Sequence, residues 1–254
     1  MPQSDKAAAF RALHVKGDPV ILFNIWDPGS ARTVEAEGAK ALATGSAPVA
    51  MAFGFSDGEK IPLELACGNF KRIAKATDLP VSMDLEGGYG GDAATIAASV
   101  KAGLKAGAVG FNFEDQIVGG QGLYEVAPQA ERVAAVRKAC DDGGVPAFVN
   151  ARTDIFLKAK PDTHSDAMLE DAITRAKAYA DAGADGFFAP GLKDEAMIER
   201  LCREVALPVN IIALPGTPPN EKLAALGVAR ISYGPVPYRQ MMKALVEAAR
   251  LALA

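Results

Sequence analysis

Three carboxylates lie at the ends of two expected strands, residues 80–86 and 109–115. Asp84 and Glu86 end the run PVSMDLE, and side chains at positions i and i+2 of a strand point to the same face. Glu114 lies near the end of the next run, VGFNFED. Carboxylates aimed at one another repel unless a cation lies between them, and oxygen ligands suit Mg²⁺ or Mn²⁺. We therefore expect Asp84, Glu86 and Glu114 to hold a divalent metal.

Arg152 supplies a positive charge in the following strand run, AFVNARTD. Its guanidinium can grip a carboxylate with two parallel hydrogen bonds. Two interpretations are open: Arg152 binds a substrate carboxylate, or it forms a purely structural ion pair with one of the three acids. The protein has a net charge of −4, so an acidic substrate would need a metal or an arginine in its site.

The elements that position these residues alternate between short β-rich runs and longer amphipathic stretches along the whole chain. Strict alternation of this kind indicates parallel strands, and eight units indicate closure into a barrel. An open doubly wound sheet is the rival, but no glycine-rich dinucleotide turn follows the first strand. We expect one α/β domain over residues 1–254, a single (β/α)₈ barrel. Its expected strands are 20–24, 41–44, 80–86, 109–115, 147–154, 186–191, 209–214 and 230–234.

Active residues of such a barrel lie where the strands end at their carboxyl termini, which is where the three acids and Arg152 fall. Glycines at the ends of amphipathic stretches predict helix termini at Gly103, Gly107, Gly183 and Gly227.

The composition excludes several other classes of protein. Charges of both signs are intermixed, so no basic surface for nucleic acid is expected. No segment reaches the roughly 18–20 apolar residues of a membrane span. Cys67, Cys140 and Cys202 are far apart in helical stretches and form no zinc-ligand pattern, which favours reduced thiols in a cytoplasmic protein.

Other catalytic arrangements lack support. No lysine other than Lys158 lies near a strand end, which disfavours a Schiff-base aldolase. His14 and His164 have no partner pattern, and we expect both on the surface rather than in catalysis. Trp26 follows the first strand, where it can pack in the core or line the barrel mouth beside a substrate.

Several motifs together resemble the isocitrate lyase/phosphoenolpyruvate mutase superfamily. They are FNIWDPGSARTVEAEG, the TGSA turn, PVSMDLEGGYG, FNFEDQ, FVNARTD and GVARISYGP, and they extend over nearly the whole chain. The resemblance implies a barrel with Mg²⁺ bound through Asp84, while Glu86 and Glu114 contribute mainly through water. It also implies a metal-stabilised enolate of pyruvate as the reacting species, formed from a small 2-oxo acid.

The resemblance also assigns roles around this metal. Asp57 matches a family acid near the metal, and Arg152 matches the family's substrate arginine; with Glu114 they are the catalytic candidates. Gly45, Ser46 and Ala47 would cradle the substrate carboxylate through backbone N–H groups and the Ser46 hydroxyl. The candidate substrate-binding residues are Trp26, Gly45, Ser46, Ala47, Arg152 and Asn210.

The segment after the fourth strand departs from the family pattern. It reads QIVGGQGLYEV and lacks the cysteine-bearing segment of the family's lyases as well as the lysine-bearing gate of its phosphonomutases. Pro190 stands where many relatives have Glu or His. A carbon–carbon lyase or decarboxylase of an oxaloacetate-like substrate is the leading interpretation. The alternatives are a phosphonopyruvate or phosphoenolpyruvate mutase or hydrolase, and a 2-oxo acid binding protein without turnover.

The resemblance further implies a homo-oligomer, a dimer or tetramer. Relatives exchange their eighth helix between subunits, and whether this chain does so is left open.

Overall fold

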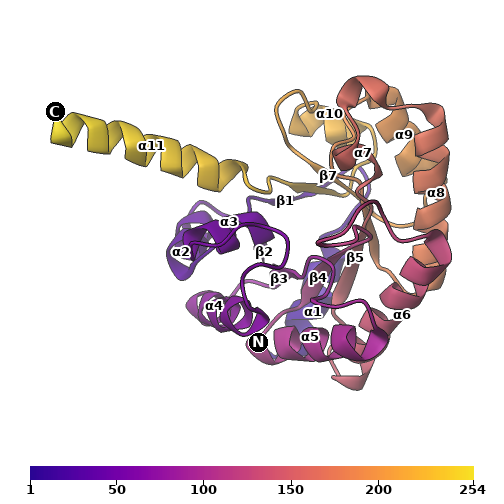
Figure 1. Ribbon diagram of the computed structural model, residues 1–254, viewed down its shortest axis with the longest axis horizontal. Helices are drawn as coiled ribbons and strands as arrows, with labels where there is room; N and C mark the ends of the chain where they lie inside the picture. Colours follow the sequence, from indigo (N-terminus) through magenta and orange to yellow (C-terminus); the bar gives the residue numbers. More distant parts are fainter.

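Eight parallel strands form a nearly closed barrel in the computed structural model, which describes residues 1–254 (Figure 1). The strands are β1 (Val20–Leu22), β2 (Leu42–Ala43), β3 (Val81–Asp84), β4 (Gly110–Glu114), β5 (Phe148–Arg152), β6 (Gly186–Phe188), β7 (Val209–Ile212) and β8 (Arg230–Ser232). Hydrogen bonds connect them in the order β1-β8-β7-β6-β5-β4-β3-β2. Only an isolated bridge between Ile25 and Thr44 joins the β1 and β2 ends. The predicted fold class and all eight predicted strands are confirmed.

Helices flank the strands, and most of them cover the outside of the barrel. They are α1 (Gln3–Ala12), α2 (Pro28–Ala36), α3 (Ser46–Ala52), α4 (Leu63–Ala76), α5 (Ala93–Ala106), α6 (Val126–Asp142), α7 (Ile155–Lys158), α8 (Asp166–Asp181), α9 (Glu195–Glu204), α10 (Asn220–Ala225) and α11 (Val236–Leu253), with a 3₁₀ turn, η1 (Pro161–Thr163). The sequence pattern did not predict α3, α7 or η1. The three cysteines lie unpaired in α4, α6 and α9, as their helical settings suggested.

Two apolar clusters stabilise this arrangement. The larger one fills the space between the sheet and the surrounding helices. The smaller one plugs the amino-terminal end of the barrel, where Phe10 of α1 packs against Leu22 and Phe148 from the barrel lining. The floor of the barrel is therefore closed, and the carboxyl ends of the strands are left to form the mouth.

His14 belongs to this floor, so the prediction that it lies on the surface is wrong. Its side chain is buried and stacks on the Phe148 ring at a centroid distance of 3.9 Å. The Nδ1 atom lies 2.8 Å from the Phe10 carbonyl oxygen. Burial, aided by the charge of Arg230, lowers the pKa of His14 to about 3, which keeps the ring neutral. His164 is half-buried, with Nε2 3.0 Å from the Phe156 carbonyl oxygen.

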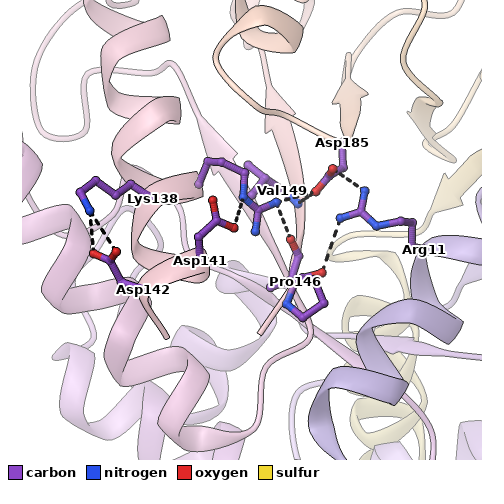
Figure 2. Close-up of polar contacts among 9 residues, drawn as sticks. Arg11, Lys138, Asp141, Asp142, Pro146, Val149 and Asp185 are labelled. Atoms are coloured by element: carbon purple, nitrogen blue, oxygen red, sulfur yellow. Dashed lines mark hydrogen bonds and ion pairs between the residues drawn. The ribbon is translucent and has the colours of Figure 1, made fainter. Parts of the chain in front are cut away.

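An ionic cluster ties several elements together at the amino-terminal ends of the strands (Figure 2). Asp185 accepts hydrogen bonds from the Val149 N–H at 2.9 Å and from Arg137 Nη1 at 3.1 Å, and it also pairs with Arg11. These contacts connect α1, α6 and β5 with the residue that precedes β6. Because this face lies opposite the mouth, we attribute its charges to stability.

Gly103 does not end a helix, contrary to the prediction, because α5 continues to Ala106. A Cβ atom at position 103 would lie 2.6 Å from Cε1 of Phe111, so this glycine allows the helix to approach the sheet closely. The helix ends instead at Gly107, where φ is +107° and glycine is favoured.

The last helix, α11, extends away from the barrel instead of closing the ring of helices (Figure 1). As a result, Ile21 and Phe23 of the first strand segment remain 37% and 38% exposed on the outside of the barrel. None of the helices combines the length and apolarity needed to cross a membrane.

Candidate functional site

A cavity of about 270 Å³ opens where the strands end at their carboxyl termini. Residues of every strand except β2, or of the segment directly after that strand, line the cavity. After β2, the residues at the start of α3 form part of the cavity wall. The lining residues are Asn24, Gly45, Ser46, Ala47, Pro48, Asp57, Asp84, Asn112, Arg152, Leu157, Phe188, Pro190, Ile212, Leu214, Ser232, Gly234, Pro235 and Arg239. Five of the predicted site residues are thus brought together with Arg152 in one cavity.

Asp84 stands at the end of β3 with its backbone and one carboxylate oxygen held in place. Its N–H donates to Thr44 Oγ1 at 3.1 Å, and its Oδ2 accepts from the Ser46 N–H at 3.0 Å. The other oxygen, Oδ1, is buried and has no hydrogen-bond partner. A buried acceptor without a partner is costly unless a cation or a donor reaches it.

Glu86 fastens the loop that carries Asp57. Its Oε2 accepts hydrogen bonds from the N–H groups of Gly58 and Glu59, at 2.9 and 2.8 Å. The residue has a left-handed backbone, with φ of +51°, which turns the chain sharply after β3. Burial, together with the charges of Asp84 and Asp57, raises the pKa of Glu86 to about 8.

Asp57 reaches the cavity from this fastened loop. Its partial burial and the charge of Asp84 raise the pKa of Asp57, and the Ser46 hydroxyl opposes that effect. A carboxyl group with a raised pKa is better able to hold and return a proton near neutral pH.

Glu114 and Arg152 face each other on β4 and β5, where they are paired in the strand register. Arg152 Nη1 lies 2.9 Å from Glu114 Oε2, and its Nε and Nη2 donate to Asp154 at 2.6 and 2.9 Å. Burial alone would lower the pKa of Arg152, but the charges of Glu114 and Asp154 outweigh the effect of burial, so the pKa is raised. Of the two interpretations of Arg152, the ion pair with an acid is present, and Arg152 also lines the cavity.

Asp154 is a site residue that the sequence analysis missed. It is fully buried, and its N–H donates to Asp115 Oδ1 at 2.9 Å. Asp115 in turn accepts from Arg175 Nη1 and the Tyr179 hydroxyl, at 3.2 and 3.1 Å. Two residues of α8 thus hold Asp115, Asp115 holds Asp154, and Asp154 holds the Arg152 guanidinium in place. The signal in the sequence is the i, i+2 spacing of Arg152 and Asp154.

Two predicted substrate-binding residues lie outside the cavity lining. Trp26 is buried in the core, and its ring packs edge-on against Tyr238 at a centroid distance of 5.2 Å. Asn210 is buried on β7, where its amide exchanges hydrogen bonds of 3.2 Å with the Ser232 hydroxyl. Their role in binding stays a prediction.

The acids do not form a closed metal cage. No three His, Cys, Asp or Glu side chains lie close enough together to surround an ion. Asp84 lines the cavity with a buried oxygen that has no partner, while one oxygen of Glu86 accepts hydrogen bonds and one of Glu114 pairs with Arg152. The donor set suits an ion that touches one carboxylate and keeps several water ligands, as Mg²⁺ does.

Comparisons with known proteins agree with this architecture. The family model for phosphoenolpyruvate phosphomutase matches residues 10–253. One similar crystal structure is that of a protein from Burkholderia cenocepacia J2315, provisionally described as a phosphonomutase. Its sequence is 47% identical, the TM-score is 0.96, and the match covers 99% of this chain and 100% of that one.

Two curated relatives are also similar along most of their length. The 2-methylisocitrate lyase of Escherichia coli strain K12 is 29% identical over 245 residues, covering 93% of this chain and 80% of that protein. The oxaloacetate decarboxylase of Pseudomonas entomophila strain L48 is 28% identical over 251 residues, covering 97% and 84%. The chain therefore belongs to the phosphoenolpyruvate phosphomutase family, within the isocitrate lyase/phosphoenolpyruvate mutase superfamily that includes lyases, decarboxylases and phosphonomutases.

Proposed function

We propose that this chain is a Mg²⁺-dependent enzyme that cleaves a carbon–carbon bond in a small 2-oxo acid. Its reaction would be that of a lyase or decarboxylase on an oxaloacetate-like substrate, leaving pyruvate as its enolate. The observation that carries the proposal is the buried, unpartnered Oδ1 of Asp84, beside Ser46 and Arg152 in one cavity. The lyase and decarboxylase relatives support the reaction class.

The residues fit a divalent ion, Mg²⁺ or Mn²⁺. Asp84 would hold it directly, and Glu86 and Glu114 would hold it through water. Such an ion supplies positive charge at an oxygen on which negative charge develops when the bond breaks. The raised pKa of Glu86 agrees with a cluster of acids that needs a cation to be fully ionised.

The other cavity residues would bind and orient the substrate. We assign its carboxylate to the turn Gly45–Ala47, where the Ala47 N–H has no acceptor within the chain. Arg152 would face the same anion, since Glu114 and Asp154 already hold its guanidinium rigid. Asp57 would hold a proton at the mouth, with its carboxyl pKa raised by burial and Asp84. Decarboxylation needs few further groups, because carbon dioxide leaves without a general acid.

A phosphonate enzyme is the second candidate, favoured by the 47% identical relative that is provisionally described as a phosphonomutase. A phosphoryl group would need a cation of its own. Arg152 is already paired with two carboxylates, and the loop 116–123 contains no lysine, arginine or histidine. Arg239, at the mouth, is the remaining basic residue that lines the cavity. This charge distribution favours the carbon–carbon reaction. A 2-oxo acid binding protein without turnover is the third candidate.

A pyruvate-release assay distinguishes the three. Oxaloacetate, 2-oxo-4-hydroxy acids and phosphonopyruvate would each be incubated with the protein and Mg²⁺ or EDTA. We expect Mg²⁺-dependent pyruvate from a carbon–carbon substrate, its loss in Asp84→Ala, and normal activity in Asp142→Ala, an exposed acid of α6. Conversion of phosphonopyruvate alone, either to pyruvate and phosphate or to phosphoenolpyruvate, would favour the second candidate. Binding of these acids without any of these products would favour the third.

We also propose that the chain forms a homo-oligomer through α11. One face of this helix exposes Met241, Met242, Leu245 and Val246, with the spacing of an amphipathic helix. The same chain leaves an uncovered hollow of about 450 Å³ over β1 and α2, lined by apolar residues that include Ile21, Phe23 and Val34. A second copy's α11 would cover such a surface.

Light scattering after gel filtration measures this assembly. We expect a dimer or tetramer for the natural chain and smaller species for Leu245→Glu. A natural chain that stays monomeric at micromolar concentration would contradict the assignment.

A further inference from the structure

A fully buried arginine lies inside the barrel directly beneath the cavity. Arg230 of β8 has no exposed surface and no carboxylate within ion-pair distance. Its Nη2 donates to Asn112 Oδ1 at 3.0 Å, its Nε lies 3.4 Å from Ser232 Oγ, and its Nη1 has no partner. Burying a cation without a counter-charge is costly, so the position of this arginine indicates a role at the cavity floor.

The contacts of Arg230 determine how the Asn112 amide is turned. Asn112 Oδ1 accepts from Arg230 and also from Asn150 Nδ2, at 2.9 Å. A guanidinium has no acceptor atom, so the oxygen of the Asn112 amide must point toward Arg230 and the barrel interior. The Nδ2 group therefore points away from the interior, and no acceptor of the chain lies within hydrogen-bond distance of it.

Asn112 lines the cavity, so its unpaired amide donor lies on the cavity floor. In the strand register Asn112 pairs with Asp84, which places the donor beside the acid that has an unpartnered oxygen. A donor fixed in this way needs no reorganisation when an anionic oxygen arrives, which is how preorganised sites stabilise charge.

We propose that Asn112 binds substrate by donating its amide N–H to an anionic oxygen of the 2-oxo acid, and that Arg230 is the positioning residue that holds this amide in its orientation. The inference rests on the proposed function for the identity of the anion as a 2-oxo acid. It adds to that function a binding residue on the floor of the cavity and a reason for the buried arginine.

The test is calorimetric titration with oxalate, a stable dianion that resembles the enolate of pyruvate. A hydrogen bond to a charged group changes affinity by about tenfold to a hundredfold. Asn112→Ala should weaken oxalate binding by that factor, while Asn220→Ala, at the start of α10 and outside the cavity, should leave it unchanged. Asn112→Asp serves as a second variant, because it removes the donor but keeps an acceptor for Arg230. Unchanged oxalate affinity in folded Asn112→Ala or Asn112→Asp would overturn the inference.

Arg230 requires a readout that a merely structural role would not produce. Arg230→Met should weaken oxalate binding in the natural background but have no further effect in the Asn112→Ala background, because its action passes through Asn112. Arg230→Lys, which keeps a donor toward Asn112, should restore most of the affinity. Equal losses in both backgrounds would show that Arg230 does not act by positioning this amide.

Titrations with and without Mg²⁺ separate this inference from the proposed function. If the natural protein binds oxalate equally well without metal, the metal-dependent function is wrong, and the metal-free comparison with Asn112→Ala still decides the role of Asn112. If the natural protein binds oxalate under neither condition, both proposals are overturned.

Discussion

Replacing Glu86 by glutamine separates the charge of this side chain from its hydrogen bonds. Glutamine keeps an oxygen that can accept from the Gly58 and Glu59 N–H groups, so the loop can stay fastened. It removes a carboxyl group whose pKa is about 8 in the folded, metal-free protein, against 4.5 for the free group. The folded state therefore keeps the proton between these pH values while the unfolded state has lost it, and the natural protein loses stability as pH rises from 4.5 to 8.

The magnitude follows from these two pKa values. At about 1.36 kcal/mol per pH unit, the natural protein should have lost about 1 kcal/mol at pH 5 and about 4 kcal/mol at pH 8. Glu86→Gln has no such loss, so its advantage in stability should grow by about 3 kcal/mol between the two pH values. Urea unfolding in the presence of EDTA, from pH 5 to pH 8, measures the difference. Parallel pH profiles for the two proteins would show that the burial of Glu86 does not disfavour its charge.

Further predictions concern packing and the buried network behind the site. Gly103→Ala should destabilise the protein by about 1–3 kcal/mol in urea unfolding, since the added Cβ would collide with Phe111. Gly68→Ala, inside α4 with no atom outside the helix's own backbone within 4 Å of the added Cβ, should instead stabilise it by about 0.5–1 kcal/mol; a loss of similar size at both positions would refute the packing argument. Asp115→Ala should cost about 3–5 kcal/mol, because three buried donors, the Asp154 N–H, Arg175 Nη1 and the Tyr179 hydroxyl, would lose this acceptor, and a cost below about 1 kcal/mol would contradict that account.

Much of the fold follows from local patterns in the sequence. Alternating strand and helix runs predict a parallel barrel, and the end of the third strand run places Asp84 at the cavity. Asn112 was within reach of the same reasoning, because it precedes Glu114 by two residues in an otherwise apolar strand. No local pattern predicts the role that we propose for it, since the orientation of its amide depends on Arg230, which is 118 residues away in the chain.

Other features depend on contacts that no local pattern records. Glu86 accepts hydrogen bonds from the loop at Gly58 and is not among the residues that line the cavity, because its backbone turns to a φ of +51° after β3. His14 directly follows the amino-terminal helix α1, yet the Phe148 ring stacks on it at the floor of the barrel. The last helix, α11, has the same amphipathic pattern as the helices before it. That its apolar face is exposed follows only from the structure, in which α11 extends away from the barrel.

The most direct test of a metal-dependent 2-oxo acid site is the melting temperature of the protein with oxalate, in the presence of Mg²⁺ or EDTA. We expect oxalate to raise the melting temperature only when Mg²⁺ is present, because ligand binding stabilises the folded state by mass action. Asp84→Ala should abolish this increase and Asp142→Ala should retain it. An equal increase in EDTA, or an unchanged increase in Asp84→Ala, would contradict the assignment of Asp84 as the metal ligand.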